Sequence, residues 1–399
     1  MGRVIGIIIK RFVLVYLGLL WLTPNIMTQT WGKKFSYEIY DAMKNGQLRA
    51  SSASYCMVDI GNYAAALQLN EVALEWGLDT LDTDMELDVI PPEDYFKNLD
   101  DQVSLVIVSE AHHKPQHRIF TRKILKTLYD KGFRYLGLEA LTTNFNHPQF
   151  VLDSLLNDRR YPLDSPLTGR YAMEPMMGQL IRTALDLGFT VFGYDRFGGD
   201  IERDLGQAMN IKKMMDRDPE GKYLIHCGWY HAIESDYPKR KDDRYMAHHL
   251  KRLTGHDPLT VYQDLLSEKY LYRESPVYEK LQGEMGIVVN SRGEALKMVD
   301  HFDVLVYHPR TTFKYGRPSY LFSNPNMRMI KMSLTEYDLS YPVHIEATLI
   351  KEGQDATPMD RVEVLSPYQN TNLILPPGEY SIYIIDNTGK TMTTVKNID

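Results

Sequence analysis

The sequence predicts an α/β fold in which a mainly parallel sheet is flanked by helices, with a helical segment before it and a small all-β sandwich domain after it. Short apolar runs alternate with amphipathic helical patterns after residue 101, which is typical of βαβ units. Beyond residue 325 helical periodicity disappears and apolar and polar residues alternate. The 399-residue chain is 44% hydrophobic and 24% charged, so it can bury a core in roughly two or three domains.

Residues 1–30 have the pattern of an export signal. Arg3, Lys10 and Arg11 are basic, and 12–22 is an unbroken apolar run. This run is shorter than the about 20 residues that span a bilayer. We therefore expect a cleaved signal, no stable membrane span after cleavage, and an exported protein. Its expected location is periplasmic or extracellular, with association to the envelope as a further alternative.

The rest of the chain divides into three predicted parts. Residues 31–100 form a helical preface, because apolar residues recur there at helical spacing. Residues 101–325 form the α/β domain, and 326–399 form the C-terminal β-sandwich domain, whose last hairpin is bounded by turn residues. The predicted strands of the α/β domain are Val103–Val108, Tyr135–Leu138, Thr190–Gly193, Tyr223–Cys227, Leu259–Tyr262 and Phe302–Tyr307.

Charge and cysteine content limit the partners. With 45 Lys and Arg against 52 Asp and Glu, the net charge is -7, so the chain lacks the positive surface that holds a phosphate backbone, and we expect no nucleic-acid partner. Cys56 and Cys227 are the only cysteines. They form either one isolated bridge or two buried thiols. The oligomeric state is open.

Each predicted parallel strand is followed by acidic, imidazole or other polar side chains. Because the carboxyl ends of parallel strands line one crevice, these groups are expected to share a pocket. The histidines support this, since 111–118 alone holds three of the twelve in the chain. The strand-end residues are Glu110, His112, His113, His117, Glu139, Tyr194, Asp195, His226, Tyr230, His231, Gln263 and His308.

Two kinds of chemistry fit this group. Imidazoles and carboxylates from separate strands can hold a divalent ion such as manganese, zinc or cobalt, which would activate a bound water. Without a metal, a histidine oriented by a neighbouring glutamate can act as a general base. Ser109 lies in no G-x-S-x-G elbow, and no nucleotide-binding glycine motif follows a strand. The functions that remain for this group of residues are hydrolysis and ligand binding.

Four segments resemble the superfamily of ChaN-like haem-binding lipoproteins, erythromycin esterases and TraB/TIKI metalloproteases. The stretch 109–118 (SEAHHKPQHR) is similar to the family's G-E-x-H-D-N-P-x-H-H, and 137–140 (GLEA) to its second strand. The stretch 203–211 (RDLGQAMNI) resembles the R-[DE]-x-x-M-A-x-N-I helix, and 227–232 the late G-x-x-H strand end. The similarity covers about residues 102–308.

The resemblance implies a central site of Glu110, His112, Glu139 and His231, with Arg203 and His117 in support. Ser109 replaces the family's glycine, and His113 its aspartate. In the esterase-like pattern the histidine lies three residues after the glutamate, which would select His113, so both histidines are kept as catalytic candidates.

We therefore expect an exported hydrolase that activates water against an ester or peptide bond, directly or through a metal held by His112, Glu139 and His231, on a small-molecule or peptide substrate. The alternative is a haem- or iron-binding envelope protein of the ChaN-like type, with Tyr194, Tyr230 and His231 on exposed loops as axial ligands and His117 beside the cofactor. A third possibility is an interaction module whose pocket has no activity.

Overall fold

A computed structural model describes residues 34–69, 81–82, 84–196, 201–237, 243–298 and 300–399. The predicted export signal lies outside these residues. None of the helices in the described part of the chain combines the length and apolar character that a bilayer crossing needs.

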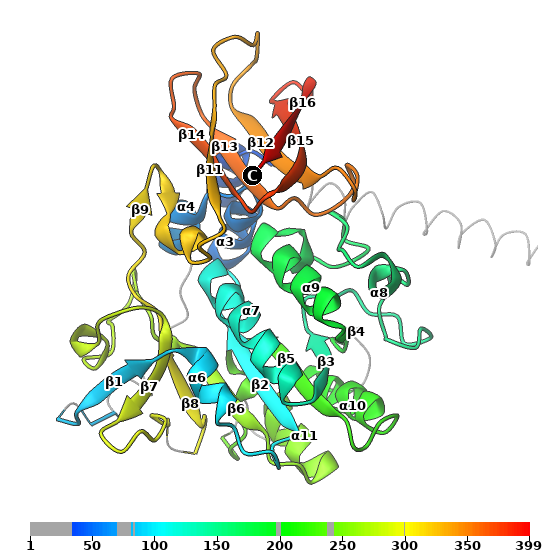
Figure 1. Ribbon diagram of the computed structural model, residues 1–399, viewed down its shortest axis with the longest axis vertical. Coiled ribbons are helices and arrows are strands. Elements are labelled where there is room, and N and C mark those ends of the chain that lie inside the picture. The colour runs from blue at the N-terminus through cyan, green and yellow to red at the C-terminus, as the bar shows by residue number, and fades with distance from the viewer. Residues whose placement is uncertain (1–33, 70–80, 83, 197–200, 238–242, 299) are drawn as a thin grey trace, which may run out of the picture.

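An eight-stranded sheet forms the centre of the molecule, in the order β1-β7-β8-β6-β2-β5-β3-β4 (Figure 1). The six strands from β8 to β4 are parallel and correspond to the six predicted strands, so the α/β fold class is confirmed. Their bounds are β2 Leu105–Glu110, β3 Phe133–Leu138, β4 Thr190–Gly193, β5 Lys222–Gly228, β6 Leu259–Leu266 and β8 Val304–Tyr307.

Two strands that the sequence analysis did not place extend one edge of this sheet. β7 (Gly286–Asn290) pairs antiparallel with β8, and β1 (Leu87–Ile90) pairs antiparallel with β7. β1 falls inside the predicted helical preface, which is therefore not entirely helical. α6 (Pro92–Lys97) follows β1.

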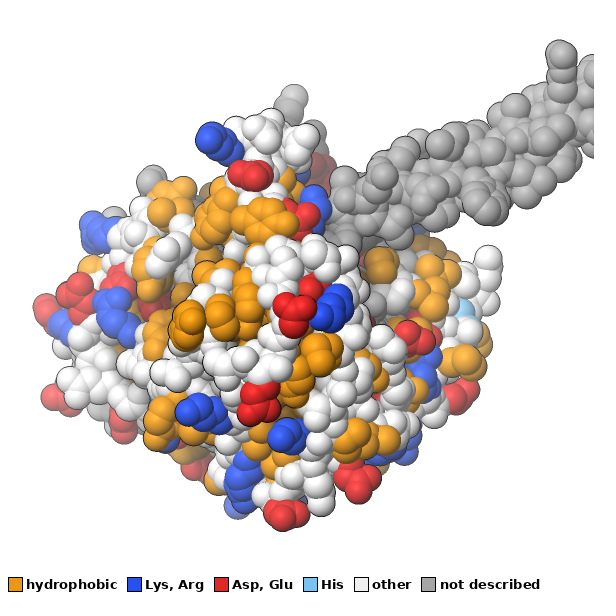
Figure 2. Space-filling view, turned by 90° about the horizontal axis from the view of Figure 1, so that it is seen from above, with side chains coloured by type: hydrophobic (Ala, Val, Ile, Leu, Met, Phe, Trp, Pro, Cys, Tyr) orange, Lys and Arg blue, Asp and Glu red, His pale blue; other side chains and the backbone are white. Residues whose placement is uncertain are grey.

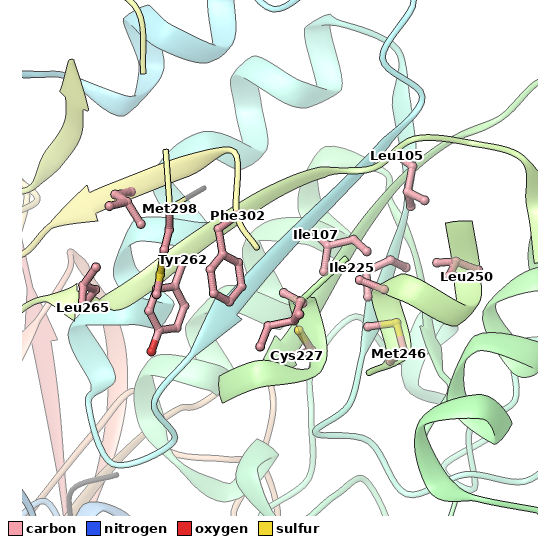
Figure 3. Packing of buried hydrophobic residues seen from close by; sticks show 14 of the residues in the cluster. Leu105, Ile107, Ile225, Cys227, Met246, Leu250, Tyr262, Leu265, Met298 and Phe302 are labelled. Carbon is pink, nitrogen blue, oxygen red and sulfur yellow. The ribbon is translucent and has the colours of Figure 1, made fainter. Parts of the chain in front are cut away.

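Helices cover both faces of the sheet because its central strands are apolar on both sides. On β2, Val106 packs in the cluster under α7 (Pro115–Asp130) and α9 (Pro175–Leu187). Ile107 points the other way, toward α10 (Arg203–Met215) and α11 (Met246–Thr254). Figure 3 shows this second layer, in which Met246 and Leu250 of α11 lie over side chains of β2 and β5. The alternation is the pattern of a parallel sheet buried on both faces.

Antiparallel sheets follow at the C-terminal end. The larger sheet has the order β13-β12-β15-β16, and β11 pairs with β14. Their apolar faces share one core, as the alternating burial along β15 requires. The bounds are β11 Arg328–Met332, β12 Val343–Leu349, β13 Asp360–Val364, β14 Thr371–Leu375, β15 Gly378–Asp386 and β16 Thr391–Ile398. Seen from this end, the surface mixes hydrophobic side chains with charges of both signs (Figure 2).

The N-terminal helices join the two parts of the molecule. α2 (Ser36–Lys44), α3 (Ala50–Asp59) and α4 (Tyr63–Leu69) share an apolar cluster with α7, α9 and the C-terminal sheets (Figure 1). Arg361 of β13 is buried and donates from Nη1 to the carbonyl oxygen of Asp59 at 2.6 Å. Cys56 and Cys227 are both buried free thiols.

The remaining elements are short. They are α8 Leu156–Arg159, the 3-10 helices η1 Tyr171–Met173, η2 Trp229–Ala232, η3 Tyr278–Lys280 and η4 Ser319–Phe322, and the strand pair β9 Phe313–Lys314 and β10 Arg317–Pro318.

Candidate active site

The carboxyl ends of four neighbouring strands bring the candidate site together. Glu110 ends β2, Glu139 follows β3, and Asp195 follows β4. Two further side chains come from α10, where Glu202 accepts a hydrogen bond from the backbone of Leu205 at 3.1 Å and caps the first turn. Arg203 and Asp204 lie in that turn, and His231 comes from η2 after β5.

Glu110 and His112 form the first imidazole–carboxylate pair. His112 Nδ1 lies 2.6 Å from Glu110 Oε1, and both residues are buried. Arg118 binds the same carboxylate through Nε at 2.8 Å and Nη2 at 2.9 Å. Burial alone would raise the pKa of Glu110, but Arg118, His226 and the hydrogen bonds hold it well below its usual range. Glu110 is therefore a carboxylate that accepts a hydrogen bond from His112 Nδ1–H, which leaves Nε2 on the far side of the ring.

Arg118 is fixed from a second side. Its Nη1 donates to Glu174 Oε2 at 2.8 Å. The same Glu174 oxygen accepts from the backbone of Met177 at 2.8 Å and caps α9. A chain of buried groups thus connects the start of α9 to the carboxylate that orients His112.

Two tyrosines enclose His112. The ring of Tyr171 stacks on the imidazole with centroids 4.1 Å apart, and Tyr55 of α3 meets it edge-on at 5.7 Å. The sequence analysis missed both, since neither follows a strand of the sheet and only the packing of the N-terminal helices brings Tyr55 here.

Gly228 allows His112 and Glu139 to approach each other. A methyl group on Gly228 would lie 2.3 Å from His112 Nε2 and 3.2 Å from Glu139 Oε2, so both groups face the same point above the backbone. The Gly228 N–H donates to Glu139 Oε2 at 2.5 Å. Burial would raise the pKa of Glu139, but His231, His112 and Arg203 lower it to about 2.

Asp204 and His231 form the second imidazole–carboxylate pair. His231 Nδ1 lies 2.5 Å from Asp204 Oδ1, and Nε2 lies 3.5 Å from Glu139 Oε1. Burial opposes the charged imidazole, but Glu139 and Asp204 outweigh it and raise the pKa of His231. Trp229, in a left-handed backbone conformation with φ of 48°, turns the chain between β5 and this histidine.

Arg203 contacts Glu139, Asp195 and His231. Its Nη2 donates to Glu139 Oε1 at 2.6 Å and to Asp195 Oδ2 at 2.9 Å. Its Nη1 lies 3.3 Å from His231 Nε2. The guanidinium is about one-third exposed, whereas its acidic partners are almost completely buried, so it presents positive charge from the site toward solvent.

These contacts do not fit the expected metal held by His112, Glu139 and His231. Both Glu139 oxygens already accept hydrogen bonds, and a guanidinium lies beside His231 Nε2. In the described part of the chain, no group of three or more His, Cys, Asp or Glu side chains is arranged to hold a metal ion. In this arrangement the three side chains are engaged with other protein groups, and a metal held by them stays a prediction.

His113 and His117 lie apart from the site. His113 stacks on Trp229 at 5.5 Å, and burial and the Lys114 charge hold its pKa well below the usual range. His117 Nδ1 accepts from the backbone of Ala111 at 2.9 Å, and its ring lies 4.5 Å from that of His308. The structure thus brings His112, not His113, against Glu110.

The expectation that Tyr194 and Tyr230 lie on exposed loops is wrong. Tyr194 is completely buried, and its hydroxyl donates to the carbonyl oxygen of His226 at 2.8 Å. Tyr230 is half-buried and packs against Tyr245 and Tyr262. Both rings are part of the packing beside α10 and α11.

No family model and no curated protein matches the chain. Among solved structures it is similar to the type III effector HopBA1, at 14% identity over 58% of this chain and 98% of that chain, with a TM-score of 0.36. ChaN of Campylobacter jejuni, described with cofacial haem, shares 12% identity over 54% of this chain and 91% of that chain, with a TM-score of 0.33. RRSP, a MARTX toxin effector domain of Vibrio vulnificus CMCP6, shares 16% identity over 43% of this chain and 36% of that chain, with a TM-score of 0.29. Similarities this distant assign neither a family nor an activity.

Proposed function

We propose that this chain is an exported hydrolase in which His112 activates a water molecule against an ester or peptide bond of a small-molecule or peptide substrate. The observation that carries the proposal is the pair of imidazoles, each held at Nδ1 by a buried carboxylate at 2.6 or 2.5 Å. Nε2 of His112 faces Glu139 across Gly228, and Nε2 of His231 lies 3.5 Å from the same carboxylate.

The two histidines take different roles because their surroundings differ. His112 Nε2 has a free lone pair, so it accepts the proton of a water molecule while the water oxygen bonds to the carbonyl carbon. The carbonyl oxygen becomes an oxyanion, which Arg203 and the imidazolium of His231 stabilise. When the tetrahedral intermediate collapses, the bond to the leaving group breaks and the proton on His112 passes to that group.

Glu139 and Asp195 keep Arg203 in position. Both are carboxylates that accept from its Nη2. Glu139 also supports the charged form of His231. The carboxylates therefore hold the partly exposed positive charge of Arg203 in place and do not themselves attack the substrate.

The test is hydrolysis of chromogenic acyl esters and of a peptide library by the wild-type protein, His112→Gln and a control, His256→Gln. His256 precedes β6 and lies near Ser104 at the amino ends of the parallel strands, opposite the carboxyl ends that carry the site. We expect turnover by the wild type and the control, and a rate about 10²–10⁴ lower in His112→Gln. Equal rates in all three proteins would contradict the proposal.

Haem binding is the alternative, and the same samples test it. Its expected ligands are poorly placed, because Tyr194 and His117 are completely buried and His231 already contacts Asp204 and Arg203. Titration with haemin should give no Soret shift that depends on His231. A shift that His231→Gln abolishes, without any hydrolysis by the wild type, would favour the haem-binding protein.

A further inference from the structure

A cavity of about 720 Å³ lies away from the candidate active site. Its walls come from α7, α9, the α8 segment and the loop between β12 and β13, including Arg122, Arg182 and Lys351. None of its lining residues belongs to either imidazole–carboxylate pair. The volume lies in the range of small-molecule sites.

The lining is rich in positive charge. Six cationic side chains face two carboxylates, Asp186 and Glu352. The six are Arg122, Lys123, Arg159, Arg160, Arg182 and Lys351.

Four of these cations have carboxylate partners. Arg182 pairs with Glu352 at 2.6 Å, and Arg160 with Asp186 at 3.4 Å. Carboxylates outside the lining take two more, Asp153 at 2.5 Å from Arg159 and Glu93 at 3.6 Å from Lys123. The remaining two of the six cations are Arg122 and Lys351. The described residues provide no ion pair for either of them.

Arg122 is the more unusual of the two. Its Nη1 donates to the neutral amide oxygen of Gln179. Burial lowers the pKa of Arg122 to about 10, and Glu174 acts on it only through space. Arg122 is half-buried, and none of the described carboxylates contacts its guanidinium, so an anion in the cavity could pair with it.

The lining of the cavity also includes apolar side chains. Ile119, Met327, Leu349 and Met359 line it together with Pro376. A ligand that fills the cavity would therefore carry an apolar group beside its charge.

We propose that this cavity binds a small phosphate monoester. Its dianion matches the two unpaired cations, and the planar guanidinium of Arg122 suits two phosphate oxygens. The organic group of the ester lies against the apolar side chains of the lining. The site is separate from the hydrolytic one and does not depend on the proposed activity.

The experiment is calorimetric titration of the full chain with phenyl phosphate, inorganic phosphate and benzyl alcohol at pH 8, where a phosphate monoester is a dianion. We expect phenyl phosphate to bind at one site per chain, inorganic phosphate to bind more weakly, and benzyl alcohol not to bind. Arg122→Gln and Lys351→Gln should each weaken phenyl phosphate binding about tenfold or more. Lys351 is exposed, so its variant keeps the test valid if Arg122→Gln fails to fold.

Two variants serve as controls. Lys396→Gln removes an exposed lysine of β16 outside the cavity, and His112→Gln alters the candidate active site; both should bind phenyl phosphate like the wild type. Three results would overturn the proposal. The first is no binding by the wild type at about 1 mM, and the second is unchanged affinity in both cavity variants. The third is loss of binding in His112→Gln, because that would place the anion in the candidate active site.

Discussion

At the scale of single residues, the proposed mechanism assigns a base and an acid from the charges around each histidine. Glu110 is neutralised by Arg118, whereas Glu139 and Asp204 both raise the pKa of His231. In the proposed mechanism the same residue type accepts a proton at one position and holds one at the other. The proposed roles of the two histidines therefore follow from the charged groups around each imidazole.

Glu110→Gln tests the orientation of the base. The glutamine amide would donate to His112 Nδ1 and leave the proton on Nε2, the wrong nitrogen for a base. We expect kcat to fall about 10²–10⁴-fold with an unchanged circular dichroism spectrum, and Glu379→Gln, on the half-exposed side of β15, to keep full activity. A Glu110→Gln protein as fast as the wild type would remove Glu110 from the mechanism.

Asp204→Asn tests the charge of His231. The pKa of His231 is raised, so the imidazolium is complete below its ordinary value and is lost as pH rises through the raised value. Activity should therefore fall on the alkaline side. Removing the Asp204 charge should move that limb of the pH–kcat/KM profile about one unit lower; a limb that stays in place would show that His231 does not set it.

At the scale of elements, the strand ends could be predicted and the partners that pack onto them could not. The continuous apolar runs identified all six parallel strands. They therefore placed Glu110, Glu139 and His231 together at the carboxyl ends of the strands. β1 and β7, which are four and five residues long and pair antiparallel at one side of the sheet, were missed. Tyr55 and Tyr171 reach His112 through tertiary packing, which leaves no local pattern in the sequence.

Gly228, the last residue of β5, gives a prediction at this scale. Gly228→Ala would place a methyl group 2.3 Å from His112 Nε2, so the ring must move. We expect an activity loss of at least about 100-fold and a loss of about 1–3 kcal/mol in the free energy of unfolding, measured by urea denaturation.

Cys227→Ala is the matched control, because this neighbouring side chain packs in the apolar layer under α11 (Figure 3). It should lower stability while activity is retained. Equal activity in the two variants would mean that the approach of His112 to Gly228 is not needed.

At the scale of the whole molecule, buried neutral histidines should make the fold sensitive to acid. Burial lowers the pKa of His226 to about 4 and of His308 to about 3, and holds those of His113 and His117 well below normal. In the unfolded chain each titrates near about 6.5. The unfolded state therefore binds more protons between about pH 6.5 and 4, and stability falls as pH falls through this window.

Thermal unfolding from pH 8 to pH 4 measures this effect. We expect Tm to decrease below about pH 6.5, with a smaller decrease in the double variant His117→Gln/His308→Gln. His231 acts in the opposite direction, since its contribution is lost as pH rises, but it is one group against four. A Tm that stays level down to about pH 5 would contradict the buried neutral state of these rings.

The measurement that tests the central claim most directly is a double-mutant cycle on ester or peptide hydrolysis with His112→Gln, His231→Gln and the double variant. If the two imidazoles act as one unit, each single variant should lose about 100-fold or more in kcat/KM, and the double variant should be little slower than the worse single one. Losses that multiply, or single variants as active as the wild type, would contradict a shared site at the carboxyl ends of β2 and β5.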